Sequence, residues 1–168
     1  MNEIRDADLT RDLQVIRSLW LDYLTWGNDE MEAKHGFRLP VHATVERDLA
    51  NIAKFQPPDG CILLAFVENV AVGIACMQRI GSATAEVKRM YVRPSSRRLG
   101  LGRGMLERLI EAARAAGYGS IRLDSPDFMT AAHALYRSGG FVDIESYPES
   151  EIPDEYKGYW VFMEKILR

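Results

Sequence analysis

The spacing of apolar and polar residues along the chain predicts alternating strands and helices. Leu13, Ile16, Trp20 and Tyr23 recur every three or four residues, which is typical of one buried helix face. Residues 61–67 are apolar without alternation, as in a strand buried on both faces. The full pattern predicts strands near residues 2–6, 61–67, 70–80, 84–92, 120–125, 141–144 and 159–166, and helices starting after Asp8 or Thr10 and near 41–55, 102–116 and 129–138. This order, βααβββαβαββ, predicts one mixed α/β domain built on a single sheet.

Three local features refine this picture. The stretch 25–40 is polar and irregular and predicts a loop, whereas Glu68-Asn69 predicts the two-residue turn of a hairpin. Lys88 and Arg89 are neighbours in a predicted strand, where successive side chains point to opposite faces. If the strand is central, a β-bulge near Met90 would accommodate both charges. The alternative is an edge strand with one wet face.

Length and composition indicate one globular domain spanning residues 1–168, because 168 residues suffice for a single core. No apolar run approaches the roughly 20 residues of a membrane span. The charged N-terminus is unlike a secretory signal, so a cytoplasmic protein is expected. Cys61 and Cys76 lack CxxC spacing and are predicted to be reduced core residues, with a single disulfide as the alternative. The three histidines are dispersed and predict no metal site.

Charge is unevenly distributed, although the net charge of −3 gives no reason to expect nucleic acid as a partner. Residues 88–103 contain six basic side chains and no acid, which makes this segment a candidate anion site. Residues 143–155 contain six acids and no base, which makes that segment a candidate cation-facing loop. The alternative for either run is a solvated surface.

A glycine- and arginine-rich segment, residues 97–104 (RRLGLGRG), lies between a predicted strand and a predicted helix. The first N–H groups of a helix have no internal partner and carry partial positive charge. Glycines let a ligand approach this backbone, and arginines add fixed charge. The segment therefore predicts a phosphate-binding cradle. The alternative is a tight turn with solvated arginines.

A dinucleotide-binding loop is the first alternative for this cradle, because Gly100 and Gly102 match the start of GxGxxG and Asp124 follows about twenty residues later. Met105 occupies the third glycine position, however, and the connection over residues 93–99 is too long for that turn. A P-loop is excluded because the chain has no GxxxxGK[ST].

The pattern Arg97-x-x-Gly100-x-Gly102 resembles the [QR]-x-x-G-x-[GA] signature of the GNAT superfamily of N-acetyltransferases. The preceding EVKRMYV (86–92) resembles the fourth strand of that family, and AAHALYRSGGF (131–141) is similar to its A-x-x-LY-x-x-x-GF motif. Phe162-Met163-Glu164 resembles its last strand. The resemblance covers residues 60–168, and over 1–55 it is only topological. It implies the GNAT fold: a mixed, mostly antiparallel sheet of six to seven strands, about four helices, and a splayed parallel strand pair that binds acetyl-CoA.

The resemblance also implies the site residues. Val92 would donate its N–H to the oxyanion, Tyr136 would protonate the leaving thiolate, and Glu86 would act as base through water, with His133 a weaker candidate. The alternatives are a core role for Tyr136 and an ion-pair role for Glu86 with Lys88 or Arg89. Met129 stands where many members have an asparagine, and it would pack against the pantetheine arm. The implied cofactor-binding residues are Met90, Tyr91, Val92, Arg97, Arg98, Leu99, Gly100, Leu101, Gly102, Arg103, Met129 and Tyr136.

By the same resemblance, residues 20–40 and 145–158 would select the acceptor, with Trp26, Glu86 and Tyr147 as candidate contacts. An aromatic and acidic mouth suits a cationic amine. The implied activity is acetyl transfer from acetyl-CoA to a primary amine of a small molecule or protein, by direct attack in a ternary complex and without a metal. The alternatives are a non-catalytic acyl-CoA-binding module and a dinucleotide-binding oxidoreductase. Family members are often homodimers, and the sequence shows no interface signature.

Overall fold

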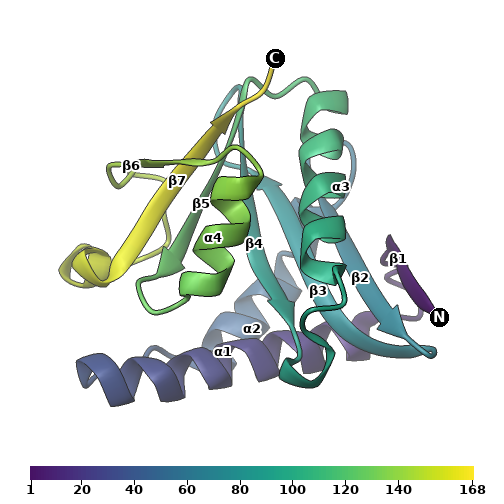
Figure 1. The fold of residues 1–168 in the computed structure, drawn as a ribbon, viewed down its shortest axis with the longest axis horizontal. Coiled ribbons are helices and arrows are strands. Elements are labelled where there is room, and N and C mark those ends of the chain that lie inside the picture. The colour runs from purple at the N-terminus through teal and green to yellow at the C-terminus, as the bar shows by residue number, and fades with distance from the viewer.

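The computed structural model describes residues 1–168 and contains one sheet with helices on both faces (Figure 1). The strands are β1 (Asn2–Asp6), β2 (Cys61–Val67), β3 (Val70–Arg79), β4 (Thr84–Val92), β5 (Ser120–Pro126), β6 (Val142–Ile144) and β7 (Trp160–Ile166). The α-helices are α1 (Leu13–His35), α2 (Val41–Ala50), α3 (Leu101–Ala115) and α4 (Thr130–Ser138), with 3₁₀ turns at Ile52–Phe55, Pro94–Ser96 and Asp154–Tyr159. The predicted order of strands and helices is confirmed. No helix is both long and apolar enough to cross a bilayer.

The sheet has the strand order β1-β2-β3-β4-β5-β7-β6, and only β4 and β5 run parallel. Their pairing ends at Glu86 and Arg122. Beyond that point the two strands diverge toward the end of the sheet that faces α1 (Figure 1). The predicted splayed parallel pair is therefore confirmed.

Two apolar cores lie on opposite faces of this sheet. Helices α3 and α4 cover one face, where Met105 and Leu109 are fully buried, and α1 and α2 cover the other (Figure 1). Strand β2 serves both, because Leu63 packs into the first core and Leu64 into the second. The prediction of a strand buried on both faces is confirmed. The cysteines are free, as expected, with Cys61 in the first core and Cys76 in the second.

Helix α1 differs from the sequence prediction at both ends. It continues to His35, where a loop was expected from residue 25, and it begins after Asp12 rather than after Asp8 or Thr10. A buried polar residue stabilises its later turns. The Asn28 side chain forms two hydrogen bonds, of 2.7 and 2.9 Å, with the Leu39 backbone. Apolar periodicity alone does not register such a contact. The second predicted helix is likewise shorter and ends at Ala50, before the separate 3₁₀ turn.

The expected β-bulge lies in β4 at Arg89, whose φ of 51° is left-handed. Lys88 pairs with Cys76 and Tyr91 pairs with Ile74, so two residues of β4 oppose one residue of β3. The extra residue lets Lys88 and Arg89 both turn toward the α1 and α2 face, since strict alternation would send Arg89 into the α3 core. The hairpin turn at residues 68–69 is also confirmed, with φ values of 47° and 66°.

Candidate active site

The diverging strands open a groove of about 630 Å³ between β4, the N-terminus of α3 and the start of α4. Eleven of the twelve residues predicted to bind the cofactor line it: Met90, Tyr91, Val92, Arg97, Arg98, Gly100, Leu101, Gly102, Arg103, Met129 and Tyr136. The twelfth, Leu99, is outside the lining and half exposed. The structure therefore brings the residues named from three separate motifs together around one cavity.

The β4 backbone supplies this groove with an unpaired donor. The Arg93 N–H donates to the Val72 carbonyl at 2.8 Å, and Val92 is paired with Gly73. Because antiparallel neighbours alternate between bonded and non-bonded pairs, the Val92 N–H points away from β3. Strand β5 has already diverged on that side, so no strand accepts it. The Val92 carbonyl accepts from Arg97 Nε at 3.0 Å, whereas its N–H remains available to a ligand.

The N-terminus of α3 supplies the groove with positive charge. Gly100 precedes the helix with a φ of 79°, a left-handed conformation that favours glycine, and no side chain caps the helix. A Cβ at Gly102 would lie 3.4 Å from Leu135 Cδ2, at the groove wall. Arg98 and Arg103 line the same end of the groove. These free amides and guanidinium groups fit a phosphate-bearing ligand.

Trp26, a predicted acceptor contact, lines this groove. Arg97 stacks over its ring with 5.1 Å from the guanidinium carbon to the ring centroid, and over the Tyr91 ring at 6.0 Å. The reason is the longer α1 helix, which carries Trp26 across to the glycine-rich segment. Its predicted contact with the acceptor stays a prediction.

The Tyr136 side chain reaches the groove from α4. It is 6 % exposed, lines the cavity and makes no hydrogen bond within the protein. Burial raises the pKa of its phenol, and the negative charge of Asp124 adds to this effect. The phenol is therefore protonated at neutral pH and can donate a proton to a group in the groove.

A second, smaller cavity of about 210 Å³ lies on the α1 and α2 side of β4. Its polar lining comes from five elements: Asn28 of α1, Thr44 and Arg47 of α2, Arg89 of β4, Asp124 of β5, and Glu151 of the loop between β6 and β7. Tyr23 and Met129 line both this cavity and the groove. The two cavities therefore meet at these two side chains.

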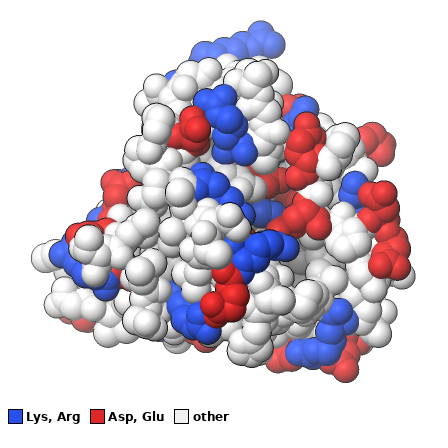
Figure 2. Space-filling model, turned by 180° about the vertical axis from the view of Figure 1, so that it is seen from behind, with Lys and Arg blue, Asp and Glu red and all other residues white.

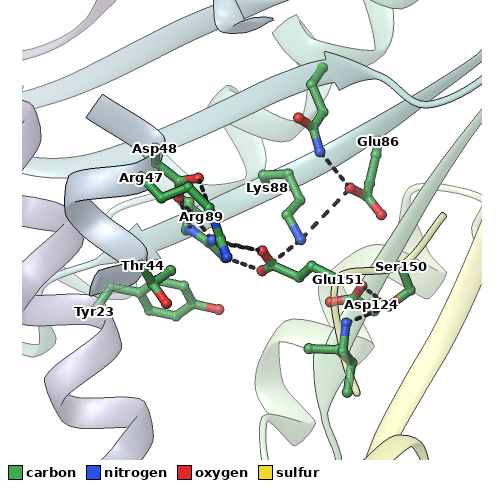
Figure 3. A network of polar contacts seen from close by, with 12 residues as sticks. Tyr23, Thr44, Arg47, Asp48, Glu86, Lys88, Arg89, Asp124, Ser150 and Glu151 are labelled. Atoms are coloured by element: carbon green, nitrogen blue, oxygen red, sulfur yellow. Dashed lines mark hydrogen bonds and ion pairs between the residues drawn. The ribbon is translucent and has the colours of Figure 1, made fainter. Parts of the chain in front are cut away.

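Glu151 accepts hydrogen bonds from three side chains, which we call the cation cluster: Arg47, Lys88 and Arg89 (Figure 3). The donor–acceptor distances are 3.0, 2.9 and 2.6 Å respectively. Burial alone would raise the pKa of Glu151, but Lys88 and Arg89 hold it well below its ordinary value. The basic and acidic runs of the sequence thus neutralise each other here. On the face opposite to Figure 1, basic and acidic side chains are also intermixed (Figure 2).

Glu86 and Tyr147 line neither cavity. The buried Tyr147 hydroxyl donates to Glu86 Oε2 at 2.6 Å, and Gln78 donates to Oε1 at 2.9 Å. Burial raises the pKa of Glu86, although the charge of Lys88 opposes this. Glu86 lies where β4 is still paired with β5, before the strands diverge, so its side chain is enclosed. The roles of both residues in catalysis and acceptor binding stay predictions.

His133, the weaker candidate for the base, is buried. Its Nε2 lies 3.0 Å from Ser125 Oγ, and burial lowers its pKa. It lines neither cavity. No group of three His, Cys, Asp or Glu side chains is placed to hold a metal ion.

We expect the Glu151 contacts to stabilise the fold in a pH-dependent way. A carboxylate whose folded pKa is lowered contributes stability above its unfolded pKa, about 4.5, and loses it as pH falls through the folded pKa. Glu151→Gln should lower the free energy of unfolding by about 1.5–3 kcal/mol at neutral pH, and this difference should shrink toward pH 3. Urea unfolding of both proteins across this range measures it, with the exposed Glu149→Gln as control. A difference that stays constant down to pH 3 would contradict the assignment.

Comparisons with known proteins point to one family. The acetyltransferase (GNAT) family matches residues 15–141. An uncharacterized N-acetyltransferase of Schizosaccharomyces pombe is 38 % identical over 113 residues, 66 % of this chain and 69 % of the relative. The IAA acetyltransferase of Azospirillum brasilense is 34 % identical, over 68 % of this chain and 74 % of the relative. The N-acetylaspartate synthetase of Danio rerio is 30 % identical, over 67 % of this chain but only 41 % of the relative.

Solved structures show the same fold over nearly the whole chain. The PaiA N-acetyltransferase of Thermoplasma acidophilum, in complex with coenzyme A, has a TM-score of 0.75 at 18 % identity and 99 % coverage of both chains. YncA of Salmonella typhimurium, an acetyltransferase with acetyl-CoA, has a TM-score of 0.68 at 22 % identity, with 99 % and 94 % coverage. The family match covers most of the chain, including β4, the glycine-rich segment and α4. The chain therefore belongs to the GNAT family of acetyltransferases.

Proposed function

We propose that this protein transfers the acetyl group of acetyl-CoA to a primary amine by direct attack in a ternary complex. The observation that carries the proposal is the meeting of two cavities at Tyr23 and Met129. One cavity has the anion cradle and the free Val92 N–H, and the other is small and polar. The coenzyme A and acetyl-CoA present in the two neighbour structures support acetyl-CoA as the cofactor.

The groove residues would hold acetyl-CoA in two ways. The backbone of residues 90–92 would bond the pantetheine arm, because β4 has no paired strand there on the side of β5. The first amides of α3 with Arg98 and Arg103 would bind the pyrophosphate. When bound, acetyl-CoA supplies an acyl group activated as a thioester.

Two groups then assist the attack, in which the new C–N bond forms and the C–S bond breaks. The Val92 N–H stabilises the negative charge that develops on the carbonyl oxygen. The Tyr136 hydroxyl protonates the departing thiolate, since its raised pKa keeps it protonated beforehand. The attacking amine must be neutral. Glu86 would accept the proton of the amine, and it would do so through water, since Glu86 lines neither cavity.

The second cavity favours a small acceptor. At about 210 Å³ it is below the 300–1,000 Å³ typical of sites for drug-sized ligands. The relatives named N-acetylaspartate synthetase carry an N-acetylated amino acid in their name, which is in line with an acceptor of this size. A protein acceptor would insert a single side chain or terminus.

Thermal unfolding with acetyl-CoA, coenzyme A or NAD(H), followed by coenzyme A release with a panel of amines, tests the proposal. A ligand at about 100 times its Kd adds roughly 2.7 kcal/mol of stability, which raises the midpoint by roughly 5–10 °C for a chain of this size. Both CoA species should stabilise, and at least one amine should release coenzyme A. Stabilisation without release for any amine would favour the non-catalytic module, and stabilisation by NAD(H) alone would favour an oxidoreductase.

A further inference from the structure

The second cavity has two polar ends, and the loop between β6 and β7 contacts both of them (Figure 3). At one end Glu151 accepts hydrogen bonds from the cation cluster. At the other end Ser150 Oγ donates to Asp124 Oδ2 at 2.9 Å. Two consecutive loop residues thus present a carboxylate to the cations and a hydrogen-bond donor to the acid.

The cationic end of the cavity pairs four cations with three carboxylates. The cation cluster and Lys54 contact Glu151, Asp48 and Glu86. Burial raises the pKa of Glu86, although the charge of Lys88, 3.7 Å away, opposes this. Of the four cations only Arg47 and Arg89 line the cavity, and their guanidinium groups are suited to an incoming anion.

Glu151 is a poor site for a cationic amine. Its two oxygens already accept four charge-assisted hydrogen bonds, including a bidentate pair from Arg89 at 2.6 and 3.1 Å. The other acids of residues 143–155 do not line the second cavity. The acidic run therefore offers this cavity no carboxylate that is free of cations.

We propose that the acceptor carries a carboxylate beside its amine, as an amino acid does, and that this carboxylate binds Arg47 and Arg89 in exchange for Glu151. The proposal rests on the acetyl-transfer function above and names its acceptor class. Both guanidinium groups line the cavity, and the Arg47 side chain is 53 % exposed, so it is accessible. Planar guanidinium groups match a carboxylate with two parallel hydrogen bonds.

The opposite end places the amine at the reaction centre. Asp124 lines the cavity, as does Met129, one of the two side chains where the cavity meets the groove. Its carboxylate attracts the ammonium group of an amino acid, in exchange for the Ser150 hydroxyl. An acceptor bound with its carboxylate on the arginines thus directs its amine toward the thioester.

Calorimetric titration tests the acceptor class without turnover. The probes are the standard L-amino acids and their α-amides, each added to the protein saturated with coenzyme A, which has no acetyl group to transfer. We expect at least one amino acid to bind about tenfold or more tightly than its amide, the effect of one charge-assisted hydrogen bond. Equal or tighter binding of the amides, or no binding of any amino acid, overturns the proposal.

Two variants and a control locate the effect. Arg47→Gln should weaken binding of that amino acid about tenfold or more, with little change for the amide. Arg17→Gln, which removes the same charge from an ion pair with Glu46 outside the cavity, should change neither. Glu151→Gln should tighten amino-acid binding, because it removes the competing carboxylate. Weaker binding in Glu151→Gln, or equal losses for acid and amide in Arg47→Gln, would show that the carboxylate is not bound there.

These outcomes are separable from failure of the proposed function. Amino-acid binding with the expected response to Arg47→Gln, but without transfer from acetyl-CoA, would uphold the carboxylate site and refute the activity. Acetylation of amines that lack a carboxylate, in preference to amino acids, would uphold the activity and refute the acceptor class.

Discussion

Replacement of Tyr136 by phenylalanine should lower kcat by about 10²–10⁴-fold, the usual contribution of a positioned general acid. The phenol lies in the groove without a hydrogen-bond partner in the protein, so its removal leaves no buried group unsatisfied. We therefore expect the variant to fold, and to be stabilised by acetyl-CoA as well as the parent protein is. Steady-state and single-turnover rates of coenzyme A release measure the effect.

Tyr118→Phe is the matched control for this variant. This variant also removes the hydroxyl of a buried tyrosine. The Tyr118 hydroxyl donates to the Asp59 carbonyl at 2.5 Å, and Tyr118 lies outside both cavities. Its kcat should stay close to that of the parent. If Tyr136→Phe retained the parent rate in single turnover, Tyr136 would not be the acid, and its role would be packing with Phe141.

Reversal of two charges in the cradle, Arg98→Glu with Arg103→Glu, should weaken acetyl-CoA binding by about 10²–10⁴-fold. Each hydrogen bond to a charged group contributes roughly 1.5–3 kcal/mol, and both guanidinium groups line the groove beside the open amides of α3. The midpoint increase with acetyl-CoA should disappear at concentrations that stabilise the parent protein. Titration of the thermal shift against ligand concentration gives the ratio of the two Kd values.

Arg114→Glu provides the control, because it reverses a charge at the opposite end of the same helix, where Arg114 contacts only Glu111. Its acetyl-CoA response should match that of the parent. Retention of the full response in the Arg98/Arg103 double variant would mean that the glycine-rich segment is a structural turn, and that the pyrophosphate binds elsewhere.

Most of the predicted cofactor residues that line the groove are close together along the chain. Residues 90–103 run from β4 into α3, and the signals for them are local: a strand irregularity, two glycines and clustered arginines. The bulge at Arg89 follows from two adjacent charges in a central strand. Only its motif predicts a catalytic role for Tyr136, because an aromatic residue on a helix is by itself equally typical of a hydrophobic core.

The second cavity could not be predicted in this way, because its polar lining comes from five elements far apart in sequence. Arg47 and Asp124 carry no local signal, and they meet only because α2 and β5 pack beside β4. The sequence predicts separate sites for the basic run at 88–103 and the acidic run at 143–155, whereas the structure pairs Lys88 and Arg89 with Glu151. Such pairing over more than 60 residues depends on tertiary structure.

The extent of α1 was missed for a related reason. The helix continues past residue 25 because Asn28 bonds the backbone at Leu39 and because Glu30 and Lys34 form an ion pair one turn apart. Neither contact produces an apolar repeat. This extension brings Trp26 to the glycine-rich segment, where Arg97 stacks over its ring.

The fate of the acetyl group tests the central claim most directly. The protein is incubated with acetyl-CoA labelled with ¹³C in the acetyl group and with a mixture of amino acids and other amines, and the products are analysed by mass spectrometry. We predict that the label appears in an amide bond on an acceptor amine, with one coenzyme A thiol released for each amide formed. Label that remains on coenzyme A, or appears only as free acetate, would contradict acetyl transfer to an amine.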